Sequence, residues 1–151
     1  MLTRNPTQPF WRQKSLAQMT PAEWEALCDG CGRCCLQKYE NKKTGKVKYT
    51  CVSCYLLDIQ TCRCKAYGER TRLVPDCEVI QPTNIHKMCW LPKTCAYRRL
   101  AEGKELAEWH PLISGTVETV HARAISVRAF AISEEYVHPD DLEAHIMNAF
   151  P

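Results

Sequence analysis

The sequence predicts an α+β fold: a small single domain, mostly helical, with a cysteine-rich metal-bound loop region and a short β-hairpin. Three observations predict it. Nine of the eleven cysteines precede residue 78, which is more thiols than packing requires. A helix-start pattern stands directly before the first cysteines, and a hairpin pattern follows them. Within one domain over residues 1–151, we expect a loose N-terminal arm at 1–18, a metal-binding region at 19–80 and a helical scaffold at 81–151.

Apolar burial alone should give this chain little stability. Leu, Ile, Val and Phe together supply 30 of the 151 residues, close to the lower limit for a self-sufficient core. A structural zinc ion contributes roughly 10 kcal/mol of apparent binding energy that is also folding energy. A bound metal could therefore supply what burial does not.

A helix is predicted directly before the first cysteines. Thr20 is a typical N-cap, Pro21 suits the first helical position, and Glu23 completes a capping box. The helix should run through Leu27 and place Cys28 at its end.

The segment CDGCGRCC at residues 28–35 carries four thiols in eight residues. In a C-x-x-C loop two thiolates can converge on one ion, and Gly30 and Gly32 can supply the positive φ angles that such a tight loop requires. The side chains of the adjacent Cys34 and Cys35 should diverge, so a single tetrahedral ion would not easily take both. One of the pair would point into the core or serve a second metal or another iron of a cluster.

A β-hairpin is predicted over residues 36–51, with its turn at 41–45. Apolar residues and lysines alternate at 46–51, as in a strand with one solvated face. The lysines would face water or a partner. The hairpin should fold Cys51 and Cys54 back over the first cysteine block.

The second half of the chain reads as helical scaffold. Short helices are expected at 84–88, at 94–102 and at 142–149, where acidic residues in the first turn suit the helix dipole. Residues 116–132 fit a strand and a helix equally well.

The cysteines should be reduced. No segment has the apolar length of a signal sequence or a membrane span, so we expect a cytoplasmic protein without a membrane partner. Thiols stay reduced in that compartment and then act as metal ligands. The alternative, an exported protein with five disulfides and one free thiol, fits less well because the signal is missing and adjacent cysteines bridge only with strain.

The order of these motifs resembles a known family. The block CxxCGxCC at 28–35 is followed by Cys54-x-x-Leu57, by Cys64-x-x-Tyr67-x-x-Arg70 and by Cys77. This order resembles the YkgJ-type cysteine-cluster family of zinc- or iron-chelating proteins. The later segments 90–98, 109–112, 125–128 and 141–146 resemble its bacterial YcgN branch. A related cysteine block occurs in bacterial flagellin lysine methylases.

The resemblance implies a set of metal ligands. Carried over by motif, they are Cys28, Cys31, Cys34, Cys35, Cys54, Cys64 and Cys77. Cys51 and Cys62 stand outside the broad motif and could equally be core residues, and Cys89 and Cys95 rank lower still.

Tyr67 and Arg70 follow Cys64 on one side of a turn and would support the site. Arg70 would counter the negative charge of the thiolates, because a guanidinium stays protonated and bonds directionally. The alternative is a surface arginine paired with Glu69 or Asp76.

The metal and its use stay open. Zinc and iron, including an iron–sulfur cluster, are both held by thiolates, and the surplus thiols lean slightly towards a cluster. Metal or redox handling is the first hypothesis, and electron or group transfer by an iron–sulfur enzyme or accessory protein is the second. No catalytic motif independent of a metal appears, and His86, His110, His121, His138 and His145 show no metal-binding spacing.

A nucleic-acid module is the third and weakest hypothesis. Residues 33–72 hold ten Lys or Arg against three acids, although the whole chain carries only +3. A solvated strand face explains these lysines more simply than a phosphate contact. No protein partner can be named.

Overall fold

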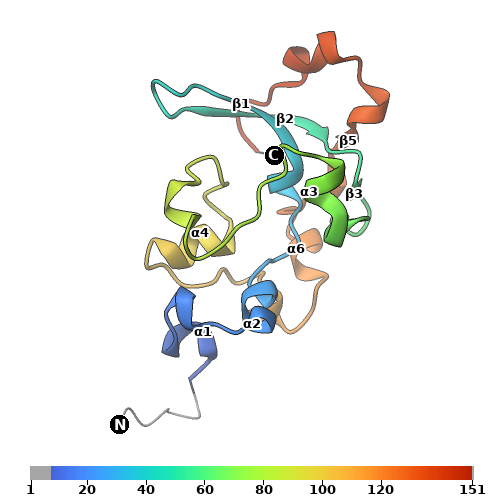
Figure 1. Cartoon of the computed structure of the whole chain (residues 1–151). Coiled ribbons are helices and arrows are strands. Elements are labelled where there is room, and N and C mark those ends of the chain that lie inside the picture. The colour runs from blue at the N-terminus through green and yellow to red at the C-terminus, as the bar shows by residue number, and fades with distance from the viewer. Residues whose placement is uncertain (1–7, 151) are drawn as a thin grey trace.

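The computed structural model describes residues 8–150 and contains two small sheets. Strand β2 (Val47–Ser53) pairs antiparallel with β1 (Leu36–Glu40) on one edge and parallel with β5 (Ile132–Ser133) on the other. Strands β3 (Leu57–Asp58) and β4 (Arg63–Cys64) form a separate antiparallel pair. The first sheet is therefore mixed, and it joins the cysteine-rich region to the C-terminal part of the chain (Figure 1).

Short helices surround the two sheets. The α-helices are α1 (Phe10–Gln13), α2 (Pro21–Ala26), α3 (Arg70–Leu73), α4 (Ala96–Ala101), α5 (Pro111–Ser114) and α6 (Thr119–Ala122). The 3-10 helices are η1 (Leu16–Gln18), η2 (Arg33–Cys35), η3 (Tyr67–Glu69), η4 (Ile85–Lys87), η5 (Val127–Ala129), η6 (Glu134–Tyr136) and η7 (Pro139–His145). Helices cover 37% and strands 13% of the described residues. The α+β architecture of a small single domain is thus observed, but the expectation of a mostly helical chain is not confirmed.

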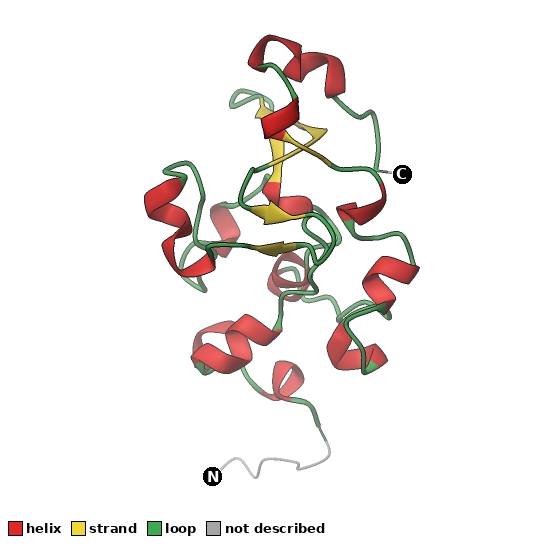
Figure 2. Ribbon diagram, turned by 90° about the vertical axis from the view of Figure 1, so that its right-hand side faces the viewer, coloured by secondary structure: helices red, strands yellow, loops and turns green. Residues whose placement is uncertain are grey.

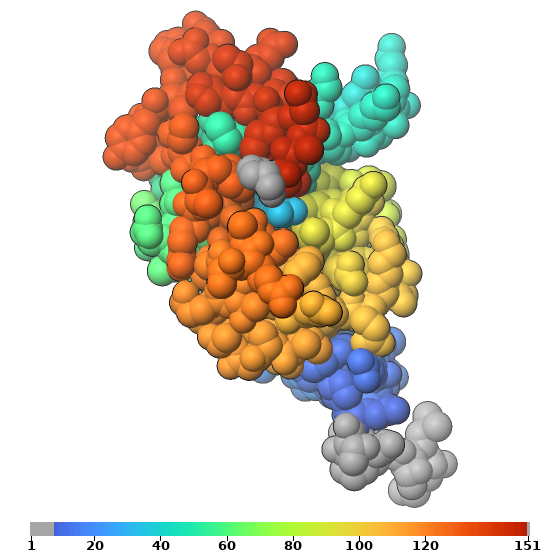
Figure 3. Space-filling model, turned by 180° about the vertical axis from the view of Figure 1, so that it is seen from behind, coloured from blue at the N-terminus to red at the C-terminus, as the bar shows by residue number. Residues whose placement is uncertain are grey.

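The two ends of the described chain lie far apart. Helices α1 and α2 form one end of the molecule, and the mixed sheet with η6 and η7 forms the opposite end (Figures 1 and 2). In the space-filling view the tip of the β1–β2 hairpin projects from the body beside the C-terminal segment (Figure 3). No helix in residues 8–150 combines the length and the apolar character that crossing a membrane would need.

The predicted capped helix is confirmed. The hydroxyl of Thr20 accepts a hydrogen bond from the Glu23 amide at 3.1 Å, and the Glu23 carboxylate accepts one from the Thr20 amide at 2.9 Å. Helix α2 begins at Pro21 and ends at Ala26, one residue earlier than expected. Leu27 follows it into the core with no exposed surface.

The predicted hairpin is also confirmed. The Asn41 amide donates to the Lys46 carbonyl at 2.8 Å, and the Gly45 amide donates to the Asn41 carbonyl at 2.7 Å. Gly45 has a φ of 73°, the left-handed conformation that favours glycine. Strand β2 continues to Ser53, so Cys54 comes directly after the strand.

Several other expectations need correction. Residues 8–18, expected in the loose arm, contain α1 and η1, while residues 1–7 lie outside the described part. Helix α4 confirms the helix expected at 94–102, but the helix expected at 84–88 is the single 3-10 turn η4. The final helix is also 3-10 and ends at His145. Residues 116–132 contain α6 and η5 and reach β5 only at their end.

Two buried apolar clusters hold these elements together. The first, here called the Leu27 cluster, consists of Leu27, Ile85, Met88, Leu91 and Tyr97. The second consists of Leu36, Leu57, Cys62 and Val127. The Leu27 cluster joins residues from both sides of the cysteine-rich region and so closes that region into a loop anchored at both ends.

Candidate metal centre

The first cysteine loop is fixed by glycine and aspartate geometry. Gly30 and Gly32 have φ angles of 77° and 74°, as the sequence predicts for a tight C-x-x-C loop. The Asp29 carboxylate accepts the Cys31 amide at 3.1 Å and the indole N–H of Trp109 at 3.1 Å. Trp109, 80 positions further along the chain, thereby helps to fix the conformation of the loop.

Close packing clamps the same loop on its other side. A Cβ atom at Gly32 would lie 2.9 Å from a methyl carbon of Val127 and 3.3 Å from the Cβ of Cys62. The Val127 amide donates to the Cys31 carbonyl at 2.9 Å. Only glycine fits this approach, so position 32 combines a conformational and a steric requirement.

His110 also anchors the loop, and both of its ring nitrogens are hydrogen-bonded to the backbone. Nε2 donates to the carbonyl of Leu27 at 2.8 Å, and Nδ1 accepts from the amide of Leu112 at 3.0 Å. Burial lowers the pKa of His110, which favours the neutral ring that this arrangement needs. His110 is therefore a structural histidine and has no free nitrogen for a metal.

The hairpin and the second sheet bring further thiols to the first block. The Cys54 amide donates to the Cys35 carbonyl at 2.9 Å, which joins the end of β2 to η2. In the second sheet Leu57 pairs with Cys64, which brings Cys64 back towards Cys54. The hairpin thus folds Cys54 back over the first cysteine block, as expected, through a backbone hydrogen bond.

Charge effects link eight thiols to one another: Cys95, described below, and the seven that the motif resemblance selects, which are here called the thiol group. The seven are Cys28, Cys31, Cys34, Cys35, Cys54, Cys64 and Cys77. Burial first, and then the charge of Cys34, raises the pKa of Cys28 to about 11. At the other end of the group, burial and the charges of Cys64 and Cys77 raise the pKa of Cys54.

The adjacent thiols of Cys34 and Cys35 are hydrogen-bonded to each other and do not diverge as we expected. This contact lowers the pKa of Cys34 and, together with burial, raises the pKa of Cys35 far above its usual range. The pair therefore loses one proton easily and retains the second. Cys35 packs against the apolar cluster of Leu36, Leu57, Cys62 and Val127, whereas Cys34 is exposed.

Two thiols accept backbone N–H groups from the residue two positions later. The Arg33 amide lies 3.5 Å from the sulfur of Cys31, and the Leu56 amide lies 3.5 Å from the sulfur of Cys54. Such donors stabilise a thiolate, the form that binds metal. In residues 8–150, however, no three Cys, His, Asp or Glu side chains stand close enough to hold an ion as they lie. The donor chemistry fits zinc or iron, and the thiols must still converge.

The remaining cysteines differ from one another in their surroundings, and all eleven are free thiols. Cys62 is 5% exposed and packs in the apolar cluster with Leu36 and Val127. Cys51 is half-buried in β2 and takes no part in the thiol contacts described above. Cys62 thus has the surroundings of a core residue, the alternative that the sequence left open.

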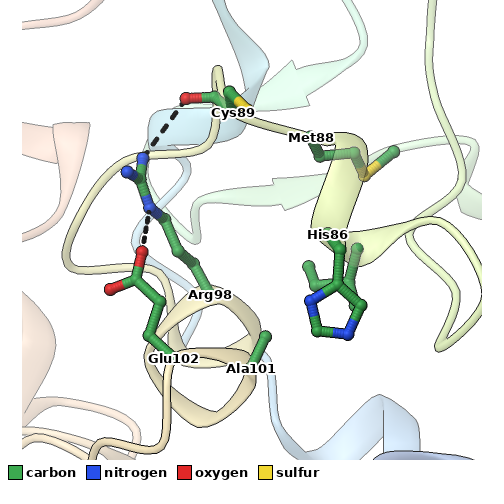
Figure 4. A pocket seen from close by; sticks show the side chains of 7 residues that line it. His86, Met88, Cys89, Arg98, Ala101 and Glu102 are labelled. Carbon is green, nitrogen blue, oxygen red and sulfur yellow. Dashed lines mark hydrogen bonds and ion pairs between the residues drawn. The ribbon is translucent and has the colours of Figure 1, made fainter.

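Cys89 lies at a separate pocket of about 120 Å³ (Figure 4). There Arg98 donates to the Glu102 carboxylate at 2.9 Å and to the Cys89 carbonyl at 3.3 Å. His86 and Met88 line the same pocket. The arginine and glutamate satisfy each other, so this pocket shows no free charge for a ligand.

Cys95 lies nearer to the thiol group than the sequence suggests. Burial raises the pKa of Cys95 to about 12, and the charges of Cys34 and Cys28 add to this effect. The broad motif does not include this position, so sequence reasoning ranked it low. The signal that could have found it is the Thr94-Cys95 pair within the segment quoted for the resemblance.

Positive charge around the thiols comes from an unexpected residue. Lys38 on β1 donates to the Cys34 carbonyl at 3.3 Å, and its ammonium group lies 4.2 Å from the centre of the Trp90 ring. The alternation of the hairpin suggested that this lysine faces solvent. Arg33, between Cys31 and Cys34 in the chain, is buried and donates to the Ile125 carbonyl at 2.8 Å.

Arg70 faces the thiol group. Its guanidinium bonds the thiol of Cys77, which opposes the rise in the pKa of Cys77 that burial causes. The same group lies 3.8 Å from the centre of the Tyr67 ring and donates to the Tyr67 carbonyl at 2.6 Å. Glu69 pairs instead with Arg72 at 3.1 Å.

Comparisons with known proteins agree on the family. The CxxCxxCC model, described as "Putative zinc- or iron-chelating domain", matches residues 27–96. A UPF0260 protein of Gluconacetobacter diazotrophicus is 54% identical over 140 residues, which cover 93% of this chain and 86% of the relative. A UPF0260 protein of Mesorhizobium japonicum is 49% identical over 145 residues, covering 95% and 98%. No solved structure matches. The chain therefore belongs to the UPF0260 family, and its cysteine-rich half carries the CxxCxxCC domain.

Proposed function

We propose that the thiol group is a zinc or iron centre and that the protein serves metal or redox handling. The observation that carries the proposal is that separate segments of the chain bring seven thiols near enough for their charges to act on neighbouring thiols, although within residues 8–150 they do not yet converge on one ion. The first loop, the end of β2, strand β4 and the turn before residue 80 each bring at least one of them. Core packing gives no reason to assemble thiols in this way.

The charges around the thiols support the same proposal. Lys38 and Arg70 bring positive charge to the group, and two backbone amides point at sulfur atoms. Seven thiolates on one ion would exceed the four ligands of a tetrahedral site. We therefore propose more than one metal ion per chain, either as separate zinc ions or as an iron–sulfur cluster.

Metal binding should draw the thiols together. As the thiols stand, charge repulsion and burial disfavour thiolates, as the raised pKa of Cys28 shows. A divalent ion reverses this balance because each metal–sulfur bond removes a proton and neutralises the charge. The loops that carry the thiols should therefore shift on metal binding so that the sulfur atoms converge.

The experiment is anaerobic purification followed by metal analysis and visible absorption spectroscopy. We expect more than one zinc or iron per chain. Colourless protein with zinc would exclude the iron–sulfur form, and brown protein with iron and acid-labile sulfide would exclude simple zinc. Protein that retains neither metal, even after anaerobic incubation with each, would overturn the proposal.

We also propose a family branch and a cellular location for the protein. The segments at 90–98 and 141–146 support placing the chain in the YcgN branch, and reduced thiols support a cytoplasmic location. Both are proposals that a phylogeny and cell fractionation would test.

A further inference from the structure

A second cavity lies beside the thiol group and gathers two arginines and a histidine from three parts of the chain. Its volume is about 190 Å³, and Arg63, His121 and Arg128 line it together with Thr61. One liquid water occupies about 30 Å³, so the cavity can hold a ligand of roughly six non-hydrogen atoms. Arg63 belongs to β4 and connects this cavity to the thiol group, because its Nη1 lies 4.0 Å from the sulfur of Cys28.

Arg63 has a free charge at this place. Among the described residues no carboxylate pairs with it, and its contact with the Cys28 sulfur is long. Its guanidinium lies against Gly30, where a Cβ atom would come within 3.2 Å of Nη2. Gly30 thus shapes the cysteine loop and also leaves room for the Arg63 side chain at the cavity.

Arg128 and His121 also have nitrogen atoms that could bind a ligand. Arg128 donates from Nε to the Gln60 carbonyl at 2.6 Å, but its Nη1 lies 3.7 Å from the carboxylate of the exposed Glu118, too far for a hydrogen bond. His121 shares Nδ1 with the Ser126 hydroxyl at 2.7 Å, which leaves Nε2 as the free ring nitrogen. Burial and the charges of Arg128 and Arg63 lower the pKa of His121, so the three groups act on one space.

The two acids at the cavity do not cancel this charge equally. Asp29 already accepts one hydrogen bond on each carboxylate oxygen, from Cys31 and from Trp109. Glu118 is 67% exposed at its side chain and can turn away into water. The cavity therefore offers two guanidinium groups and a ring nitrogen to a ligand. Two carboxylates oppose an anion there: the buried Asp29, whose oxygens are directed to Cys31 and Trp109, and the exposed Glu118, whose charge water screens.

We propose that this cavity binds a small oxyanion, a phosphate or a small carboxylate, between Arg63 and Arg128. Guanidinium groups bind both kinds of anion through paired, charge-assisted hydrogen bonds. The anion would lie next to the loop that carries Cys28, so it is placed to be a substrate or effector of the thiol group. The site goes beyond the proposed metal function and does not depend on it.

The test is isothermal titration calorimetry of the full chain, purified anaerobically, with inorganic phosphate and with malonate at constant ionic strength. We expect saturable binding of at least one, and the tighter of the two identifies the chemistry of the natural ligand. Arg63→Gln and Arg128→Gln should each weaken binding about tenfold, because each removes a charge-assisted pair. The matched control is Arg123→Gln, whose exposed side chain lies 3.6 Å from Glu108 and outside the cavity lining.

Glu118→Gln gives an independent test with the opposite sign. Removing this carboxylate should tighten anion binding, and the variant alters a surface position that carries little of the fold. Absence of saturable binding of both anions, an equal loss in Arg123→Gln, or unchanged or weaker affinity in Glu118→Gln would overturn the proposal. Metal content measured on the same samples separates the two proposals, since Arg128→Gln should keep its metal while losing the anion.

Discussion

The Leu27 cluster and the thiol group are adjacent in the chain, because Leu27 directly precedes Cys28, but different forces hold them. The cluster buries aliphatic and aromatic side chains, each of which stabilises the fold by about 1.5–3 kcal/mol. The thiol group instead brings together groups that repel one another once ionised. The cluster is held by apolar packing without a ligand, whereas the proposed function requires a metal to draw the thiol group together.

This difference assigns separate roles to the two regions. The cluster ties the segment before the cysteines to η4 and α4 after them, so it fixes where the cysteine-rich loop begins and ends. In the function that we propose, the metal then determines the conformation inside that loop. Removal of metal should loosen the thiol-bearing loops and leave the cluster folded.

The largest expected effect comes from breaking the thiol group. Cys31→Ser should abolish stoichiometric metal binding and lower the free energy of unfolding by about 5 kcal/mol, since zinc binding of roughly 10 kcal/mol is also folding energy. Metal analysis and urea unfolding of the same preparation measure both effects. Cys89→Ser, at an exposed thiol, is the matched control and should retain metal and stability. Equal metal loss in both variants would contradict the division between them.

The second effect comes from breaking the cluster. Leu91 is 1% exposed, so Leu91→Ala should lower the free energy of unfolding by about 3 kcal/mol through lost burial and a cavity. The metal content of the folded protein should stay unchanged, because the thiols are not touched. If Leu91→Ala releases metal at temperatures where the protein remains folded, the two regions are not separable as we argue.

Much of the local structure could be predicted from the sequence, because it depends on near neighbours. Thr20 with Glu23 predicts the start of α2, and the positive φ angles of Gly30 and Gly32 follow from the spacing of the cysteines. Contacts between distant residues could not be predicted. Nothing near Asp29 in the sequence indicates that Trp109 would hold it.

The directions of some side chains also could not be predicted from the sequence. Strand alternation places Lys38 on a solvated face, but the register irregularity between Leu36 and Lys38 brings it to the thiols. The 3-10 geometry of η2 likewise turns Cys34 and Cys35 towards one another, where ordinary alternation would separate them. Both errors arise from local irregularities that a sequence pattern does not encode.

The third effect is a pH dependence of the free energy of unfolding. It arises at His110, which contacts Leu27 where the two regions meet. Burial lowers the pKa of His110 in the folded state, while the unfolded value is about 6.5, so below that pH the unfolded chain binds more protons. Stability should therefore fall as pH decreases from about 6.5 and stay flat above it. The charge of Asp29 opposes this effect, and His121 adds to it with the same sign.

Urea unfolding of zinc-saturated protein at pH 7.5 and pH 5.5, with metal content checked at each pH, measures the slope. His110→Gln should flatten it, and His86→Gln, at an exposed histidine, should leave it unchanged. An unchanged slope in His110→Gln would show that metal release alone causes the acid sensitivity.

The smallest expected change in stability comes from the charge that faces the thiols, and it is also the most specific test of the comparison. Arg70 bonds the Cys77 thiol and covers the Tyr67 ring, whereas Arg72, two residues later, forms an exposed ion pair with Glu69. Arg70→Leu and Arg72→Leu should each change the free energy of unfolding by less than about 1 kcal/mol, because exposed charges contribute little. Only Arg70→Leu should speed metal loss to a chelator, roughly tenfold, because groups that contact metal ligands tune metal affinity by that order. Chelator-release kinetics on both variants measure the difference. Equal release rates would show that Arg70, like Arg72, is a surface residue and that the thiol group holds its metal without a counter-charge at Cys77.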